Sequence, residues 1–200
     1  MLRTVIIATG NPAKFQEIKD IMGRYGIAAR MSDIKVGVRE GTLSYEENAR
    51  LKASYVTARL GVDAFGEDSG IEVPALGGFP GIISARFIKG TDSDRNSALL
   101  DRMRHLGPSD RRAVFKACAV ITFVNGAFVS GYGELSGRII DGPAGENGFG
   151  YDPVFVPDGQ GRTLAQMSPR EKNDMSHRRR AVEAVLEKYV AYLKDGIDRK

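Results

Sequence analysis

Apolar and polar positions near the N-terminus follow one strand pattern and then one helix pattern. Thr4 to Ile7 is a short apolar run of the kind that forms strands. Asn11 then suits an N-cap and Pro12 the first position of a helix, and apolar residues at helical spacing follow as far as Gly26. The pattern predicts a strand, a tight polar turn and a helix.

Two further helices are expected in the next part of the chain. Ser44 can cap a helix that runs to about Leu60, with Gly61 as its stop. Residues 91–94 offer N-cap candidates for another helix. Ile27 to Val38 is expected to form a second strand with an interruption.

The second half of the chain indicates antiparallel pairing. Arg112 to Val124 is the longest β-type run, and Asn125-Gly126 is a strong hairpin turn into Ala127 to Tyr132. A capping box at Ser168 precedes a long amphipathic helix at the C-terminus. Antiparallel strands together with βα units predict an α/β fold with a mixed sheet.

Length and composition narrow the class of protein. The 200 residues make one domain, of one or two lobes, and neither a repeat nor a linker divides residues 1–200. The hydrophobic share of 42% is that of a soluble globular protein. No apolar run approaches the roughly 18 residues of a membrane span, and the N-terminus enters a strand-like run with no room for a signal peptide. We therefore expect no membrane partner.

Cysteine usage and net charge exclude fewer classes of protein. Cys118 is the only cysteine, which excludes an intrachain disulfide and a zinc site built on thiolates, and cytoplasmic localisation is expected. The net charge of +4 is compatible with nucleic acid and equally with a small polyphosphate substrate.

The acidic segment Gly66-Glu67-Asp68-Ser69-Gly70 is the first candidate for chemistry. Two adjacent carboxylates and a hydroxyl lie between glycines and between short apolar runs, so we expect them on a tight turn at a sheet edge. Oxygen ligands of this kind suit Mg²⁺. An ordinary surface turn is the alternative interpretation.

The helix start at Asn11 is a candidate phosphate site. A helix start offers free backbone N–H groups and a positive dipole end, and Lys14 in the first turn suits a bound anion. The Walker pattern is absent, and a plain strand-to-helix turn is the alternative.

Residues 133–150 are rich in glycine and are expected to form a loop. Phe149 lies between two glycines there, where little would crowd a base stacked on its ring, although a ring buried in the core is the alternative. Residues 170–180 carry five arginine or lysine side chains, and cations at a helix start indicate an anionic ligand, although a basic surface stripe is the alternative.

The chain as a whole resembles the Ham1/RdgB inosine triphosphate pyrophosphatase family from Thr4 to about Leu193. The motifs are T-G-N-x-x-K at 9–14, E-N-A at 47–49, E-D-S-G at 67–70, L-G-G-x-P-G at 76–81, F-G-Y-D-P at 149–153 and E-K-N-x-x-S-H-R at 171–178. The resemblance implies an elongated α/β fold, with a mixed sheet flanked by helices, two lobes and a nucleotide cleft between them. It implies a homodimer that hydrolyses non-standard purine nucleoside triphosphates, such as ITP, dITP and XTP, to the monophosphate and pyrophosphate with Mg²⁺.

The resemblance also assigns roles to residues. Asp68 resembles the catalytic acid, and Asp68, Glu40 and Glu67 would hold the metal, although the family often has Asp-Asp where this chain has Glu67-Asp68. The substrate-binding residues would be Thr9, Gly10, Asn11, Pro12, Ala13, Lys14, Lys52, Ser69, Phe149, Gly150, Tyr151, Asp152, Lys172, His177 and Arg178.

Base selectivity has a partial physical account. Arginine donates hydrogen bonds and accepts none, so Arg178 against position 6 of a purine would favour a 6-oxo group over a 6-amino group. Such a donor disfavours adenine but does not distinguish hypoxanthine from guanine, because both carry a 6-oxo group.

Two other classes of protein stay open at this point. A nucleotide-binding or RNA-binding module would use the same basic helix and stacking ring but would not need Asp68. A Maf-like nucleotide pyrophosphatase would carry a different motif set. On the family resemblance, we expect no stable nucleic-acid partner.

Overall fold

The computed structural model describes residues 4–197, which form one seven-stranded sheet and the helices around it. The strands follow the order β2-β1-β3-β5-β6-β7, and β4 pairs with β3. The strands are β1 (Thr4–Ile7), β2 (Ala28–Met31), β3 (Ala64–Val73), β4 (Phe79–Pro80), β5 (Arg112–Thr122), β6 (Phe128–Ile139) and β7 (Phe155–Pro157). The α-helices are α1 (Pro12–Arg24), α2 (Tyr45–Leu60), α3 (Asp92–Met103), α4 (Pro169–Met175) and α5 (His177–Ile197). Short 3₁₀ helices lie at Pro74–Leu76, Gly81–Ile83, Pro108–Arg111, Asp152–Val154 and Leu164–Gln166.

The sheet is mixed, as the sequence predicts. Strand β1 pairs in parallel with β2 and with β3. Helix α1 connects β1 to β2 and α2 connects β2 to β3, and each connection brings the chain back to the end of the sheet at which β1 starts. Strands β4 and β7 pair antiparallel with β3 and β6. The α/β prediction with helices flanking a mixed sheet is therefore confirmed.

The predicted helix starts are also confirmed. Asn11, Ser44 and Thr91 each accept a hydrogen bond from a backbone N–H in the first turn of the helix that follows. Ser168 forms a capping box with Glu171 at the start of α4. None of the helices within residues 4–197 combines the length and the apolar composition that a bilayer crossing demands.

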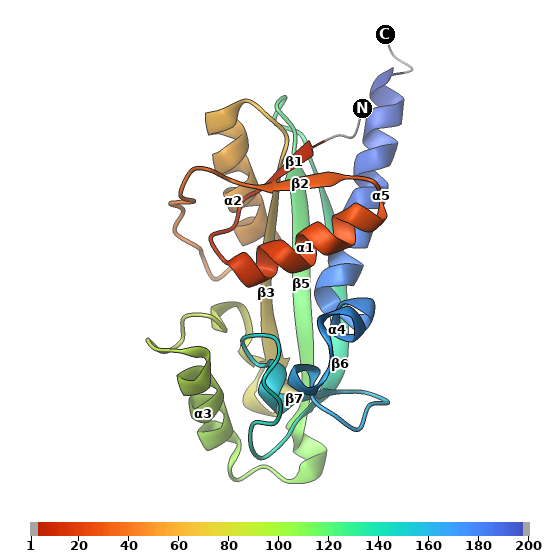
Figure 1. The fold of residues 1–200 in the computed structure, drawn as a ribbon. Coiled ribbons are helices and arrows are strands. Elements are labelled where there is room, and N and C mark those ends of the chain that lie inside the picture. The colour runs from red at the N-terminus through yellow and green to blue at the C-terminus, as the bar shows by residue number, and fades with distance from the viewer. Residues whose placement is uncertain (1–3, 198–200) are drawn as a thin grey trace. The chain divides into compact units, whose positions relative to one another are not determined.

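The chain divides into two compact units, which are described one at a time. Unit 1 comprises residues 1–68, 117–133 and 177–200 as far as the structure describes them. Helices α1 and α5 cover one face of its strands (Figure 1). Apolar side chains such as Phe65 and Val185 form a buried cluster there. Helix α2 covers the other face, with Ala49 and Ala53 against β5.

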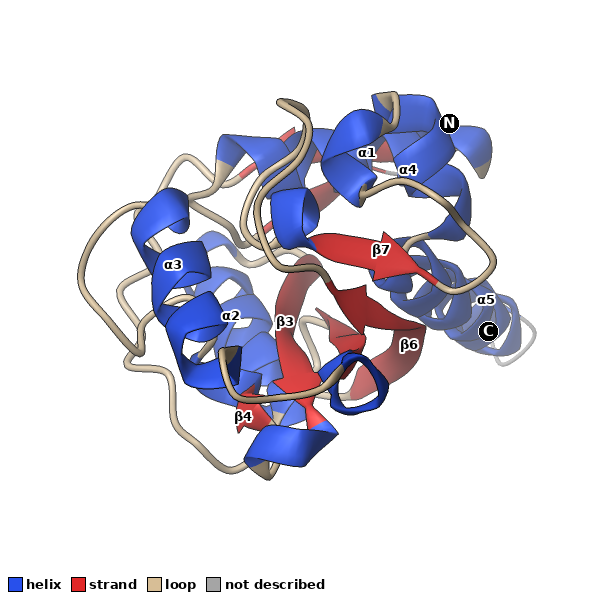
Figure 2. Cartoon of the chain, turned by 90° about the horizontal axis from the view of Figure 1, so that it is seen from below, coloured by secondary structure: helices blue, strands red, loops and turns tan. Residues whose placement is uncertain are grey.

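Unit 2 comprises residues 69–116 and 134–176. Its core holds Leu99 of α3 together with Ile71, Phe115 and Phe155 from the strands. Figure 2 shows the short strand β4 beside the end of β3 and β7 beside β6. The Phe115 and Phe155 rings meet edge to face, with centroids 4.7 Å apart.

Three sequence expectations about local structure are wrong. Residues 66–70 are not a tight turn: they lie inside β3, directly after Ala64 and Phe65, the two residues that pair with β1. The second strand covers only Ala28–Met31 of the expected 27–38. Strand β6 continues to Ile139, so the glycine-rich loop starts later than residue 133.

Helix packing explains why glycines occur inside these strands. A Cβ at Gly66 would lie 2.1 Å from the Ala49 carbonyl oxygen of α2, and a Cβ at Gly133 would lie 2.1 Å from the His177 carbonyl oxygen of α5. Both glycines therefore allow a helix backbone to approach the sheet closely, and neither marks a turn.

Replacing Gly66 with Ala should lower the free energy of unfolding by about 3 kcal/mol, because α2 must move away from β3. The matched control is Gly23→Ala in α1, where nothing lies within 4 Å of the new Cβ. That change should raise stability by about 0.5–1 kcal/mol, because alanine favours helix. Urea unfolding of both variants measures the difference, and equal stabilities would contradict the packing account.

Candidate active site

Strand β3 carries Glu67 and Asp68 into the interior, where each side chain is 5% exposed. Successive residues of a strand point to opposite faces of the sheet, so the two carboxylates have different direct partners. The two groups of charges nevertheless act on each other, since the charge of Lys52 also acts on Glu67 and that of Lys14 on Asp68. Burying a carboxylate without a partner is strongly unfavourable. Each of them is accordingly compensated, and the partners come from different helices.

Glu67 faces α1 and α5. Its carboxylate accepts a hydrogen bond from Lys14 Nζ at 2.8 Å and another from Arg178 Nε at 3.1 Å. Arg178, which is 2% exposed, also donates to Glu17 of α1. These contacts tie the first turns of both helices to the middle of β3.

The electrostatics of this face follow from burial and from the three charges. Burial acts to raise the pKa of Glu67, but the charges of Arg178 and Lys14 outweigh it and hold that pKa well below its ordinary value. Burial lowers the pKa of Lys14, and the attraction of Glu67 offsets this only in part.

Asp68 faces α2 on the opposite side. Its Oδ1 accepts from Lys52 Nζ at 3.1 Å, and the same ammonium donates to Glu40 Oε1 at 2.8 Å. Its Oδ2 accepts from Asn48 Nδ2 at 2.9 Å. The carboxylates of Asp68 and Glu40 thus converge on a single ammonium group.

The pKa values on this face shift upward. Burial raises the pKa of Asp68 above its ordinary value, in spite of the opposing charge of Lys52 and the hydrogen bond from Asn48. Burial acts to lower the pKa of Lys52, but the attraction of Asp68 and Glu40 prevails, and the pKa of Lys52 is raised.

Asn48 is a site residue that our sequence reasoning missed. It is fully buried in α2 and bonds to both backbone groups of Gly41, with Gly41 N donating to its Oδ1 at 2.8 Å. It therefore links Asp68 to the loop that carries Glu40. The only signal in the sequence for its role was its place in the E-N-A motif, because the apolar periodicity of a helix does not explain an asparagine at this position.

The turn before α1 differs in detail from the expected phosphate site. The N–H groups of Ala13 and Lys14 both donate to Asn11 Oδ1, at 2.9 and 3.1 Å, and Asn11 N donates to Thr9 Oγ1. The expected free N–H groups of this helix start are therefore engaged by Asn11, while Gly10 and Pro12 are exposed beside them.

A second group of expected site residues comes together in unit 2. Asp152 accepts from Phe149 N at 2.8 Å and forms an ion pair with Lys172. Lys172 Nζ also lies 4.3 Å from the centroid of the Phe149 ring. Asp152 and Lys172 are 2% and 3% exposed, so this arrangement is rigidly packed beneath a half-buried ring.

The remaining expected residues are more dispersed. Tyr151 points into the core of unit 2, where its hydroxyl donates to the Ser84 carbonyl at 2.7 Å and burial raises its pKa. Ser69 is half buried and follows Asp68 on β3. His177 is buried at the first position of α5.

The donor set for a metal is carboxylate oxygen. Within the described residues, no three His, Cys, Asp or Glu side chains are arranged to hold a metal ion. Glu40 and Asp68 nevertheless converge on the ammonium of Lys52, so they already share a monovalent cation. This geometry and these oxygen donors fit a hard divalent cation.

These features define a mixed α/β protein whose central strand carries a charged site suited to a polyphosphate ligand and a cation. The chain belongs to the Ham1 family, whose model matches residues 5–188. It is 43% identical over 198 residues to a dITP/XTP pyrophosphatase of Deinococcus deserti, covering 98% of this chain and 91% of that protein. It is also 43% identical to a dITP/XTP pyrophosphatase of Thermus thermophilus, over 96% of this chain and 92% of that protein.

Solved structures agree with this assignment. A HAM1 protein from Coxiella burnetii matches with a TM-score of 0.79 and 30% identity, covering 98% of this chain and all of that one. The Staphylococcus aureus Ham1 protein matches with a TM-score of 0.76 and 32% identity, over 97% of this chain and all of that one.

Replacing Glu67 with Gln should lower the free energy of unfolding at pH 7 by about 3 kcal/mol, because two buried cations lose their shared counter-charge. The pKa of Glu67 is depressed on folding, so its contribution is present above the ordinary value of 4.5 and declines as the pH falls below it.

Urea unfolding at pH 7 and pH 3 tests this expectation, and the difference from wild type should narrow at pH 3. The control is the exposed carboxylate Glu146, since Glu146→Gln should leave stability unchanged. A difference that stays constant with pH would contradict the ion-pair account.

Proposed function

We propose that this protein hydrolyses non-standard purine nucleoside triphosphates, such as ITP, dITP and XTP, to the nucleoside monophosphate and pyrophosphate. The relatives that carry the name dITP/XTP pyrophosphatase support this activity, since they match nearly the whole chain. The observation that carries the proposal is the arrangement of Glu67 and Asp68 on β3 among Lys14, Lys52 and Arg178.

This arrangement suits a triphosphate accompanied by a cation. Lys14 and Lys52 are cations held close to carboxylates, so a ligand that brings both phosphate and a metal can exchange partners with them without leaving a buried charge uncompensated. Thr9, Gly10 and Asn11 lie on the turn before α1, the helix that carries Lys14. We propose that this turn and Ser69 contact the phosphates.

We propose Mg²⁺ as the cofactor. Asp68 and Glu40 would hold the ion, which would neutralise charge on the triphosphate at the bond that breaks. Glu67 was expected as a third ligand, but it bonds to Lys14 and Arg178 on the other face of β3, so we propose that it supplies negative charge near the ion without a direct bond. The support is the pair of carboxylates on Lys52.

Asp68 is the residue to which we assign the proton chemistry. Burial raises the pKa of Asp68, which makes its carboxylate a stronger proton acceptor than that of an exposed aspartate. Asn48 and Lys52 hold its two oxygens in place. Asp68 can therefore orient a water molecule and accept its proton as the water attacks phosphorus.

For the base, we propose that Phe149 stacks on the purine ring. Lys172 lies against one face of that ring, so the base would stack on the other face. His177 and Arg178 are proposed to contact the 6-oxo group. The cytoplasm and a homodimer belong to the same proposal, and the buried free thiol of Cys118 is compatible with that compartment.

An RNA-binding module is less well supported. Such a module would present an exposed basic surface. Lys14, Lys52 and Arg178 instead form ion pairs with buried carboxylates, for which a binding module has no use.

The products formed from ITP test the proposed function. With Mg²⁺ present, we expect pyrophosphate and IMP in equal amounts, and EDTA should abolish the reaction because the cation is removed. Ion-exchange chromatography of the products makes the measurement. Orthophosphate with IDP would identify a phosphatase instead, and tight RNA binding with no turnover would favour the binding module.

The ratio of ITP to ATP hydrolysis tests the role of Arg178. Arg178→Ala removes a charged donor to the 6-oxo group, so kcat/KM for ITP should fall by about ten- to a hundredfold. ATP does not use that donor, so kcat/KM for ATP should fall much less.

Arg178→Lys is the matched control because it keeps a positive charge beside Glu67 but loses the planar donor set. An equal loss on both substrates in Arg178→Ala would mean that Arg178 acts only by holding Glu67, and the account of base choice would be wrong.

A further inference from the structure

The loop that carries Phe149 depends on glycines for its conformation. Gly148 and Gly150, on either side of Phe149, have φ values of 77° and 63°, which side chains other than glycine rarely adopt. A Cβ at Gly148 would also lie 2.2 Å from the Asp152 carboxylate. Glycine permits this conformation but does not select it, because an unconstrained glycine visits many others.

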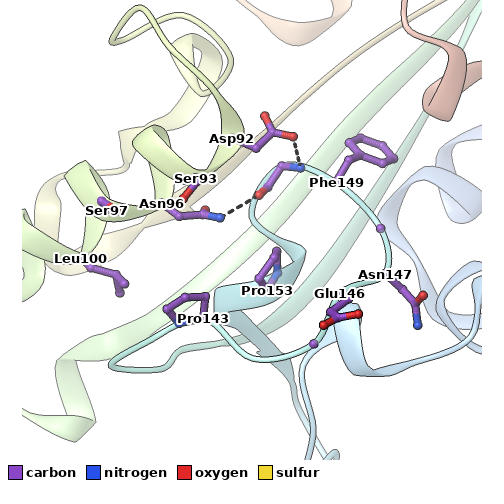
Figure 3. Close-up of a pocket in the computed structure, with 13 residues that line it drawn as sticks. Asp92, Ser93, Asn96, Ser97, Leu100, Pro143, Glu146, Asn147, Phe149 and Pro153 are labelled. Carbon is purple, nitrogen blue, oxygen red and sulfur yellow. Dashed lines mark hydrogen bonds between the residues drawn. The ribbon is translucent and has the colours of Figure 1, made fainter.

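Helix α3 supplies the constraint at Gly150. Gly150 N donates to Asp92 Oδ2 at 2.7 Å, and Gly150 O accepts from Asn96 Nδ2 at 3.0 Å (Figure 3). The N–H belongs to the peptide group before the glycine Cα and the carbonyl to the peptide group after it. The two bonds therefore fix both peptide planes and with them φ and ψ of Gly150.

The two residues are well placed on α3 for this task. Asp92 and Asn96 are four positions apart and so lie on the same side of the helix. Asp92 is further held by Arg95, with an Nη2 to Oδ1 distance of 2.6 Å. Asn96 is 5% exposed, so its amide is confined by its surroundings.

The surroundings indicate that these hydrogen bonds hold the loop where packing does not. A pocket of about 270 Å³ lies between the side of α3 that carries Asn96 and Ser97 and the loop segment around Gly148 and Gly150 (Figure 3). Apolar contact is therefore interrupted here. Asn96 Oδ1 is buried and has no hydrogen-bond partner among the described residues, so the amide of Asn96 is held through its bond to Gly150 O.

We propose that Asp92 and Asn96 are positioning residues for the base-stacking loop, holding Gly150 so that Phe149 keeps one orientation. The proposal rests on the proposed function, because it assigns the loop to the purine base. Release of the loop would populate other conformations, and the apparent affinity for the nucleotide would fall in proportion to the fraction of molecules whose loop stays in the binding conformation. The phosphate chemistry uses other residues, so kcat should be preserved.

Kinetics with ITP provide the first test. Asn96→Ala and the isosteric Asn96→Asp both remove the donor to Gly150, and each should raise KM about fivefold with kcat within about twofold of wild type. Ser97→Ala is the matched control, since Ser97 is exposed on the same helix and lines the same pocket. Asp92→Asn keeps an oxygen acceptor for Gly150 N and should retain a lower KM than Asp92→Ala.

A fluorescence measurement tests the loop without any turnover. The chain contains no tryptophan, so Phe149→Trp places a single indole in the loop. Its emission anisotropy should fall when Asn96→Ala or Asn96→Asp is added and should not change with Ser97→Ala. Circular dichroism and thermal unfolding would verify that each variant is folded.

The kinetic and the fluorescence measurements together distinguish a failure of this proposal from a failure of the proposed function. An indole that stays equally immobile in both folded Asn96 variants would overturn the positioning role. A loss confined to kcat with KM unchanged would overturn it as well. If the wild type releases no pyrophosphate, the proposed function fails, and the anisotropy alone decides whether α3 holds the loop.

Discussion

The structure of unit 1 depends on the compensation of two adjacent buried carboxylates. Glu67 and Asp68 occupy a central strand, and neither could stay ionised there without a cation. The cations arrive from separate helices: Lys14 from α1, Lys52 from α2 and Arg178 from α5. The placement of these helices on the sheet is thus coupled to the charge of one strand.

This compensation links the fold to the proposed chemistry. Gly66 lets α2 approach β3 so closely that Lys52 and Asn48 reach Asp68, two positions further along the strand. The ion pairs are internal in the absence of ligand, and each is made of groups that a metal–triphosphate could take over. A site of this kind is fully built before substrate arrives, which agrees with the general advantage of preorganised charge in catalysis.

Local patterns in the sequence predicted much of this fold, and long-range contacts escaped them. Asn11, Ser44 and Ser168 marked helix starts because capping depends on neighbours a few residues away. The position of residues 66–70 inside β3 was not predictable in the same way, since glycine and carboxylates are typical of turns. The glycine at position 66 is explained only by the close approach of α2, which is a long-range contact.

The site shows the same division between local and long-range information. Motifs identified Glu67, Asp68 and Lys14, but the partner of Glu67 at Arg178 lies 111 positions away in the chain, and only the folded sheet brings the two together. Asn48 and Asn96 were not predicted as site residues, because each acts through a single amide placed by tertiary packing. Periodicity carries no information about such contacts.

The central claim is that Asp68 accepts the proton of the attacking water and, with Glu40, holds the metal. The most direct test compares pyrophosphate release from ITP by wild type and by Asp68→Asn, with thermal unfolding measured on both. The amide fills the same space, and its oxygen can still accept a hydrogen bond from Lys52 or Asn48, so the variant should fold. Its turnover should fall by at least about a hundredfold. A folded Asp68→Asn protein with near-normal turnover would contradict the account.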